Sequence, residues 1–173
     1  QTPTEDVVHF NGLIYDRPAG KSFQDDLMDI IIRPELLNDR EADLAAVSYR
    51  ADKDIWRLLR DFGQTPLYYA EIPGGLAWSF SYVGLLDLLD SPEPDEATIF
   101  DYLATHYRYI FRDAGRTFHQ GVRQVPAGCY IDFDHRGPRI KNWMKWEHDP
   151  EIYTLDPNEA TDRLMEILTR SVA

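Results

Sequence analysis

Three pairs of short apolar segments, each joined by a brief turn, constrain the fold of this chain more than any other feature. The pairs are residues 44–49 with 55–59, 66–69 with 76–80, and 129–133 with 139–144. Their turns are rich in Gly, Pro and Asp, a composition typical of connections between neighbouring strands. We therefore predict antiparallel sheets, together with a first strand over residues 7–15.

Two helices are predicted between these strands. Ser22 is placed to cap a helix over residues 23–33, which ends before Pro34 because proline cannot continue the backbone hydrogen bonding. Asp95 follows the proline-rich stretch 91–94 and is placed to cap another helix. The apolar face expected for that second helix consists of Ile99, Leu103 and Ile110.

The last helix has the most complete N-terminal signal. Asp156 is followed by Pro157 at the first helical position and by Glu159 where a capping box needs it. Its expected apolar face consists of Leu164, Ile167, Leu168 and Val172. Two alternatives stay open: the helix packs back on its own domain, or it contacts a continuation of the protein.

Composition restricts the classes of function. The 173 residues carry a net charge of −12, so a phosphate backbone would be repelled and nucleic-acid binding is not expected. A single cysteine, Cys129, excludes an intrachain disulfide and a thiolate zinc cluster. No apolar run approaches 18 residues, so we expect a cytoplasmic protein without a membrane segment. The apolar fraction of 43% is sufficient for a packed core.

Two stretches, taken together, resemble the asparagine synthetase family. Residues 58–69 (LLRDFGQTPLYY), followed by 75–80 (GLAWSF), are similar to a family segment in which Arg-Asp turns through Gly into Pro-Leu-Tyr-Tyr. Residues 115–130 contain Thr-Phe, Gly-Val and Pro-Ala-Gly in the order of the family's linker, which precedes a hairpin and a Trp. The resemblance marks a structural motif made of Arg60, Asp61, Gly63, Pro66, Tyr68 and Tyr69.

The resemblance implies an α+β fold, a partial N-terminal-nucleophile (Ntn) hydrolase-like arrangement of layered antiparallel sheets with flanking helices. Residues 1–92 would form a degenerate glutamine amidotransferase-like domain. Residues 93–173 would supply a linker helix, a hairpin and the first helix leading to an ATP-binding synthetase domain outside this chain. That domain or chain is expected to contact the C-terminal helix, and a homodimer is the other association considered. ATP and Mg are expected there, and no cofactor or metal in this chain.

Residues 10–15 (FNGLIY) depart from the family at the catalytic centre. In one alignment they resemble Asn-Gly-Glu-Ile-Tyr, whose Asn side chain and Gly amide form an oxyanion hole, with Leu13 replacing the Glu that holds the substrate amine. In the other, Asn11 stands where the nucleophilic Cys of Met-Cys-Gly-Ile belongs. Both alignments predict no glutamine hydrolysis and no catalytic residue here. In a third interpretation, Asn11-Gly12 is only a turn or bulge.

Other local motifs have structural interpretations. Asp61-Phe62-Gly63 matches a kinase tripeptide, but the glycine-rich loop, strand lysine and His-Arg-Asp loop of a kinase do not accompany it. We interpret it as a turn, with Arg60 and Asp61 forming an ion pair at the end of a strand. Cys129, on a predicted strand, is interpreted as a buried inert thiol.

One cluster at a predicted hairpin tip contains residue types that bind metals. Asp132, Asp134 and His135 lie within four positions of one another. Acidic and polar residues are ordinary at such tips, so a metal site is disfavoured.

These observations leave three functions open. The first is a non-catalytic amidotransferase-like domain of an enzyme that adenylates a carboxylate and lets an amine attack it, as in the degenerate β-lactam synthetases and lasso peptide cyclases. The second is a stand-alone binding or regulatory half-domain. The third is a fragment of an ordinary glutamine-hydrolysing asparagine synthetase.

Overall fold

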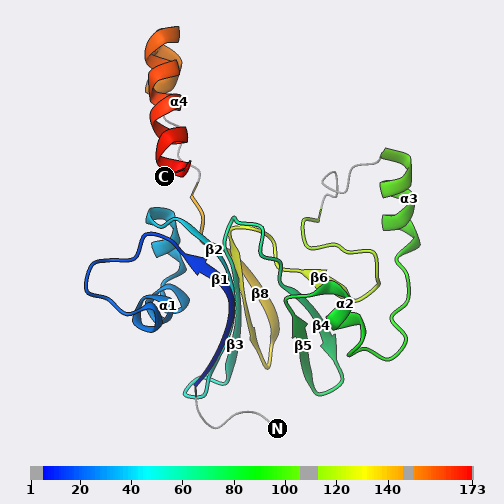
Figure 1. Cartoon of the computed structure of the whole chain (residues 1–173). Coiled ribbons are helices and arrows are strands. Elements are labelled where there is room, and N and C mark those ends of the chain that lie inside the picture. The colour runs from blue at the N-terminus through cyan, green and yellow to red at the C-terminus, as the bar shows by residue number, and fades with distance from the viewer. Residues whose placement is uncertain (1–5, 106–112, 146–149, 173) are drawn as a thin grey trace.

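The computed structural model describes residues 6–105, 113–145 and 150–172 (Figure 1). Helix accounts for 32% and strand for 33% of the structure, and all described strand pairs are antiparallel. The protein therefore belongs to the α+β class with antiparallel sheets, as the sequence predicted.

Five strands form the large sheet, in the spatial order β1-β2-β3-β7-β8. Their bounds are β1 Val7–Ile14, β2 Ala42–Arg50, β3 Ile55–Arg60, β7 Cys129–Asp134 and β8 Gly137–Asn142. The hairpins β2-β3 and β7-β8 match the predicted pairs, whereas the pairing of β3 with β7 joins segments that are far apart in the chain.

Three strands form the small sheet, in the order β5-β4-β6. Their bounds are β4 Tyr68–Ile72, β5 Gly75–Ser79 and β6 Val122–Gln124. The hairpin β4-β5 is the third predicted pair, and β6 adds to the free side of β4.

The helical segments are distributed around the two sheets. Their bounds are α1 Phe23–Ile32, η1 Pro34–Asp39, α2 Tyr82–Leu86, α3 Glu96–Thr105, η2 Pro150–Thr154 and α4 Pro157–Val172. The predicted caps are confirmed: Ser22 accepts a hydrogen bond from the Asp25 amide (3.1 Å), and Asp95 accepts from the Thr98 amide (3.0 Å). Asp156 accepts from the Asn158 amide at 2.7 Å.

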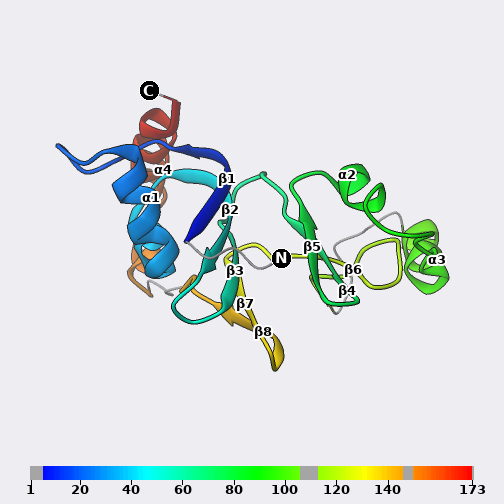
Figure 2. The ribbon, with the colours of Figure 1, turned by 90° about the horizontal axis from the view of Figure 1, so that it is seen from below.

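The sheets and helices are stacked in four layers, helix–sheet–sheet–helix (Figure 2). One apolar cluster joins α1 to the outer face of the large sheet, and a second lies between the two sheets. A third joins α2 to the outer face of the small sheet. In β2, Leu44 and Ala46 belong to the first cluster, while Ala45 and Val47 belong to the second. This strand is buried on both faces, which explains its continuous apolar sequence.

Segments on both sides of the boundary expected after residue 92 contribute to each sheet. Strand β6 completes the small sheet, and β7 and β8 extend the large sheet beside β3. Residues 122–142 therefore share the core of residues 1–92.

Helices α3 and α4 lie outside these layers (Figure 1). In α3 only Thr98 is buried, and Leu103 of the expected apolar face is 62% exposed. Ile110 lies outside the described residues. In α4, Leu164 and Leu168 are 55% and 49% exposed, so this helix does not pack back on the sheets. The side chain of Val172 is not among those described.

Candidate functional site

The Asn11-Gly12-Leu13 segment and the motif that begins at Arg60 meet at the beginning of β2. Asn11, Gly12 and Leu13 lie opposite Ala45, Leu44 and Asp43 in a one-to-one register. Because Asn11-Gly12 lies inside a regularly paired strand, its interpretation as a turn or bulge is wrong. On the other side of β2, Asp61 continues β3 and donates its amide to the Leu44 carbonyl at 2.9 Å.

Two glycines allow the chain segments to approach this closely. Gly12 has φ +121°, and a Cβ there would lie 1.9 Å from the carbonyl oxygen of Asp43. A Cβ on Gly63 would lie 2.6 Å from Oδ1 of Asp43. Both positions therefore require glycine for steric reasons, from opposite sides of the same residue.

Asp61 is the buried acceptor at this junction. Its carboxylate accepts from the amides of Leu44 (2.9 Å) and Gly63 (2.7 Å), while only 3% of the residue is exposed. Burial raises the pKa of Asp61 to about 6, the two amides act in the opposite direction, and the Asp43 carboxylate raises it further. The side chain takes the place of a backbone acceptor for Leu44 and fixes the turn after β3.

The side chain of Arg60 contacts a different part of the chain from that of Asp61. Its guanidinium donates to the carbonyl oxygens of Thr65 and Val125, both at 3.1 Å. The indole of Trp143 donates to the Arg60 carbonyl at 3.1 Å. Both side chains have main-chain partners, and the charge of Arg60 also lowers the pKa of Asp61.

Pro66, Tyr68 and Tyr69 carry the chain from this junction into the small sheet. Pro66 is half-buried just before β4, whose first two residues are the tyrosines. Tyr69 is 2% exposed and packs edge-on against Phe133 between the sheets, whereas Tyr68 contacts Tyr82 of α2 on the outer face. Both tyrosines pack within the fold, one on each face of the small sheet.

The side chains around Gly12 lack a nucleophile among the described residues. Asn11 and Leu13 are exposed, and Leu13 offers only a hydrocarbon surface. Cys129 lies in the same cross-strand row as Asn11, but two strands separate them, which corresponds to roughly 14 Å. Cys129 is buried, and burial raises the pKa of its thiol. This thiol is too far away to attack a group held at Asn11.

The possible metal ligands at the β7-β8 tip are occupied by cations. Asp132 accepts from Arg57 at 2.7 Å, and Asp134 pairs with Arg139, which lowers the pKa of Asp134. Within the described part of the chain, no group of three His, Cys, Asp or Glu side chains could hold a metal ion.

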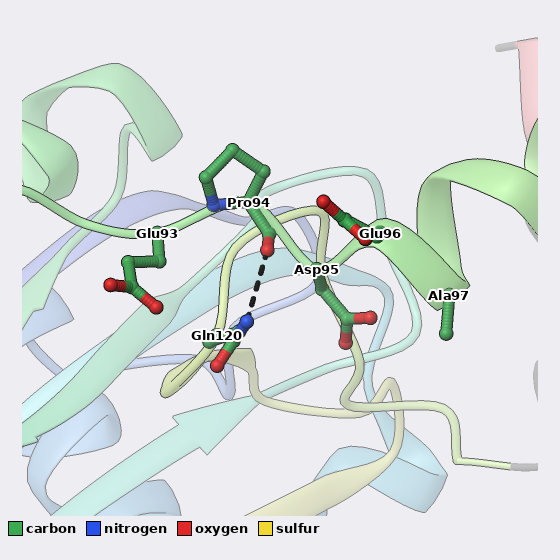
Figure 3. A pocket seen from close by; sticks show the side chains of 6 residues that line it. All are labelled: Glu93, Pro94, Asp95, Glu96, Ala97 and Gln120. Atoms are coloured by element: carbon green, nitrogen blue, oxygen red, sulfur yellow. Dashed lines mark hydrogen bonds between the residues drawn. The ribbon is translucent and has the colours of Figure 1, made fainter.

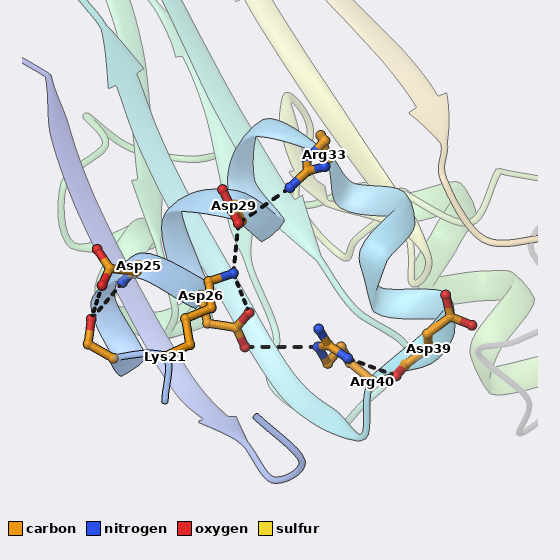
Figure 4. Close-up of polar contacts among 8 residues, drawn as sticks. Lys21, Asp25, Asp26, Asp29, Arg33, Asp39 and Arg40 are labelled. Carbon is orange, nitrogen blue, oxygen red and sulfur yellow. Dashed lines mark hydrogen bonds and ion pairs between the residues drawn. The ribbon is translucent and has the colours of Figure 1, made fainter. Parts of the chain in front are cut away.

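A second polar network joins α1 to the loop before β2 (Figure 4). Asp26 is fully buried and pairs with Lys21 at 2.9 Å, while Lys21 also reaches Asp29 at 2.7 Å. The Arg40 Nε lies 3.9 Å from Asp26 Oδ2, and neither atom has a hydrogen-bond partner. The network anchors the first turns of α1 to the chain that enters β2.

An open depression of ≈ 630 Å³ lies at the start of α3, in a segment that the sequence marked only as a boundary (Figure 3). Its lining is Glu93, Pro94, Asp95, Glu96, Ala97 and Gln120. Asp95 accepts two hydrogen bonds from Arg116 (3.0 and 3.1 Å), and this guanidinium lowers the pKa of Asp95 to about 2. Gln120 donates to the Pro94 carbonyl at 3.1 Å. These contacts hold α3 to the 116–120 loop.

No family model matches this sequence, and no curated protein is similar enough to count as a match. The class of the protein is thus given by its fold alone: it is a layered α+β protein with two antiparallel sheets. Among the described residues, no helix combines the length and apolar character needed to cross a membrane.

Proposed function

We propose that this chain is a non-catalytic amidotransferase-like domain of an ATP-dependent, amide-forming enzyme related to asparagine synthetases. In this proposal a separate synthetase domain adenylates a carboxylate, and an amine attacks the adenylate to form an amide or a macrolactam. The domain described here would support that centre without releasing ammonia from glutamine.

The proximity of Asn11-Gly12-Leu13 to the run from Arg60 to Tyr69, on either side of Asp43 and Leu44, is the observation that carries the proposal. The resemblance rests on residues 58–69 with 75–80 and on residues 115–130, and Asn11-Gly12-Leu13 is the segment that departs from the family at its catalytic centre. Gly12 and Gly63 approach Asp43 from opposite sides, so the departing segment lies beside the part of the chain that carries the resemblance. The helix–sheet–sheet–helix order is consistent with an Ntn-like domain and supports the same proposal.

Leu13 supports the loss of glutaminase activity. At this position the resemblance requires a carboxylate to bind the substrate ammonium group, and a leucine side chain makes no such charge-assisted hydrogen bond. A thiol supplied from elsewhere would not restore this contact. The amide of Asn11 is not a nucleophile, and Cys129 is buried in the sheet.

Helix α4 is the expected contact with the synthetase domain. Leu164 and Leu168 lie one helical turn apart, are about half exposed, and form an apolar stripe on a helix that extends away from the sheets (Figure 1). A protein segment that covers this stripe would bury apolar side chains without leaving polar groups unpaired.

The deciding experiment is ATP–pyrophosphate exchange by the natural full-length protein, with a panel of carboxylic acids. We expect exchange with at least one acid, and a large reduction in the Leu168→Asp variant because a charge disrupts the apolar stripe. Asp162→Asn, on the opposite side of α4, is the matched control and should leave exchange unchanged. Absence of exchange with every acid would argue for a stand-alone binding domain instead.

Incubation of the same protein with glutamine tests the second part of the proposal. We expect no glutamate above the background of spontaneous hydrolysis. Steady glutamate release would identify an ordinary glutamine-hydrolysing asparagine synthetase and contradict the loss of activity.

A further inference from the structure

Strand β1 is an edge of the large sheet that lacks the usual protection against pairing. It is 8 residues long with the sequence VVHFNGLI, and it contains no Asp, Glu, Lys, Arg or Pro. Edge strands present unpaired backbone groups, and natural proteins blunt them with charge, proline or short length. None of these devices is present in β1.

The other three sheet edges carry such devices. Strand β8, at the opposite edge of the large sheet, contains Pro138, Arg139 and Lys141. The edges of the small sheet are short, with 5 residues in β5 and 3 in β6. The open character of β1 is therefore specific to this strand and not a general property of the two sheets.

Hydrogen-bond alternation identifies the backbone groups that face outward. Tyr15 donates its amide to the Glu41 carbonyl at 2.8 Å, one step beyond the pair Ile14 and Ala42. In an antiparallel ladder every second pair is hydrogen-bonded, so the odd-numbered residues of β1 bond to β2. The amides and carbonyls of Val8, Phe10, Gly12 and Ile14 are directed to the open edge, where an added antiparallel strand would satisfy them in series.

Exposed apolar side chains accompany these backbone groups. Phe10 is 45% exposed and Leu13 59%, although both lie within the strand. Phe10 packs one face on Phe23 of α1, with ring centres 5.0 Å apart, and leaves the rest of its ring at the edge. An added strand would therefore gain apolar contact as well as main-chain hydrogen bonds.

We propose that β1 pairs antiparallel with β1 of a second copy of this chain, around a two-fold axis at Asn11, to form a continuous sheet through both molecules. In this register Val8 lies opposite Ile14 of the second copy, and Phe10 lies opposite Gly12 of the second copy. The same pairs recur on the other side of the axis, so the outward groups of all four residues have partners.

The sequence of β1 is complementary to itself in this register. The ring of Phe10 covers the backbone of Gly12 of the second copy, which has no side chain of its own to cover it, an arrangement known to stabilise glycine in sheets. The two Asn11 residues meet in a non-hydrogen-bonded pair, where side chains are closest, and their amides donate to and accept from each other. Asp6 faces Asp16 of the second copy at both ends, and each molecule carries −12, so added salt strengthens the association.

Substitution of Asn11 at the axis by a charged residue tests both the association and its register. Sedimentation velocity of the full 173-residue chain at increasing concentration should show a monomer–dimer equilibrium. Asn11→Lys and Asn11→Glu should each weaken dimerisation about tenfold or more, because like charges then face each other. An equimolar mixture of the two variants should recover the dimer, because opposite charges meet. Ile140→Lys on β8 is the control at the protected edge and should dimerise like the unmodified chain.

A disulfide provides an independent measurement. Two cysteines in a non-hydrogen-bonded antiparallel pair are close enough for a disulfide, so Asn11→Cys should give a covalent dimer on oxidation. Leu13→Cys should not, because the two substituted positions would be about 14 Å apart along the strands. Circular dichroism melts confirm that each variant is folded.

Three results would overturn the inference. If the chain is a monomer at every concentration, the association does not occur. If Ile140→Lys abolishes the dimer, the contact is made by β8 and not by β1. If the mixture of the two charge variants stays monomeric and Asn11→Cys forms no disulfide, the proposed register is wrong. None of these outcomes depends on amide formation, so this inference and the proposed function fail separately.

Discussion

The outer faces of the two sheets hold their helices by different means. On the large sheet, Arg57 donates to Asp132 at 2.7 and 3.0 Å and to the Ile31 carbonyl at the end of α1 at 2.8 Å. Its guanidinium also lies over the Tyr130 ring, 4.4 Å from the centre. One side chain thus joins β3, β7 and the last turn of α1, whose carbonyls have no helical partner.

The outer face of the small sheet is apolar. Ala70, Ala77 and Val122 form a cluster with Leu85 of α2, a helix of 5 residues whose cap is Ser81. Apolar packing is non-directional, whereas hydrogen bonds to charged groups require a particular geometry. Helix α1 is therefore held by burial together with charged, directional contacts, whereas α2 is held mainly by burial, with one hydrogen bond between the Tyr82 hydroxyl and His119.

Removal of Arg57 should have the largest effect. Arg57→Met leaves Asp132 buried without its main cation and the end of α1 without its donor, and should lower the free energy of unfolding by about 4 kcal/mol. Urea denaturation measures the change. Lys141→Met is the matched control: Lys141 also approaches Asp132, at 3.7 Å, but is half exposed, so its loss should cost less than about 0.5 kcal/mol. Equal effects of both variants would contradict the special role of Arg57.

Addition of one methyl group at Gly12 should come next. Gly12→Ala would place a Cβ 1.9 Å from the Asp43 carbonyl oxygen, and the resulting shift of β1 should cost about 3 kcal/mol. Gly74→Ala, in the small-sheet hairpin, is the control because its φ is +85° but no atom lies within 4 Å. It should cost only about 1 kcal/mol, the strain of the backbone conformation alone. Denaturation midpoints that shift equally would remove the steric argument.

Asp61, which is buried, and Asp95, which is paired with Arg116, should give opposite dependences of stability on pH. Asp61 has a pKa of about 6 in the folded protein and 3.8 as its reference value, so the folded state binds its proton more strongly. Stability should therefore fall as pH rises from about 4 to 6, by about 3 kcal/mol, and this component should be missing in Asp61→Asn.

Asp95, beside the small sheet, is the comparison. Its pKa of about 2 lies below the reference of 3.8, so its contribution is present above that value and is lost as pH falls towards 2. Thermal melts across pH 2–7 measure both contributions. A stability profile of Asp61→Asn that is parallel to that of the unmodified protein would contradict the raised pKa.

The small sheet should give the smallest of these effects. Leu85 is fully buried, but its cluster is small and close to the surface, so Leu85→Ala should cost about 2 kcal/mol. Val83→Ala on the same helix is the control, because Val83 is 65% exposed and its truncation should cost less than about 0.5 kcal/mol. A cost for Leu85→Ala above that for Arg57→Met would reverse the comparison between the two faces.

The local elements were largely predictable from the sequence. The three hairpins, the first strand and the caps Ser22, Asp95 and Asp156 were predicted from turn residues and short-range hydrogen-bond patterns. Each of these features depends on residues only a few positions apart, so its energetics are visible in a short window. The exposure of the apolar face of α3 was not predictable, because a helical pattern shows which residues align but not whether another element covers them.

The roles at the candidate site were less predictable. Arg60 and Asp61 are adjacent, and their charges suggested an ion pair, but the partners of Asp61 include the Leu44 amide, 17 positions away. The sequence placed Gly12 and Gly63 in two separate segments, but it did not show that both lie against Asp43. That relation requires the register of β1, β2 and β3.

The sequence by itself determined the antiparallel class, the positions of the turns and the helix starts, because these follow from local backbone preferences and side-chain capping. Only the tertiary structure decided that β7 pairs with β3, that Asp61 serves a distant amide and that β1 is left as an open edge. Such features depend on which strands become neighbours, and that choice follows from burial summed over the whole core rather than from any short segment.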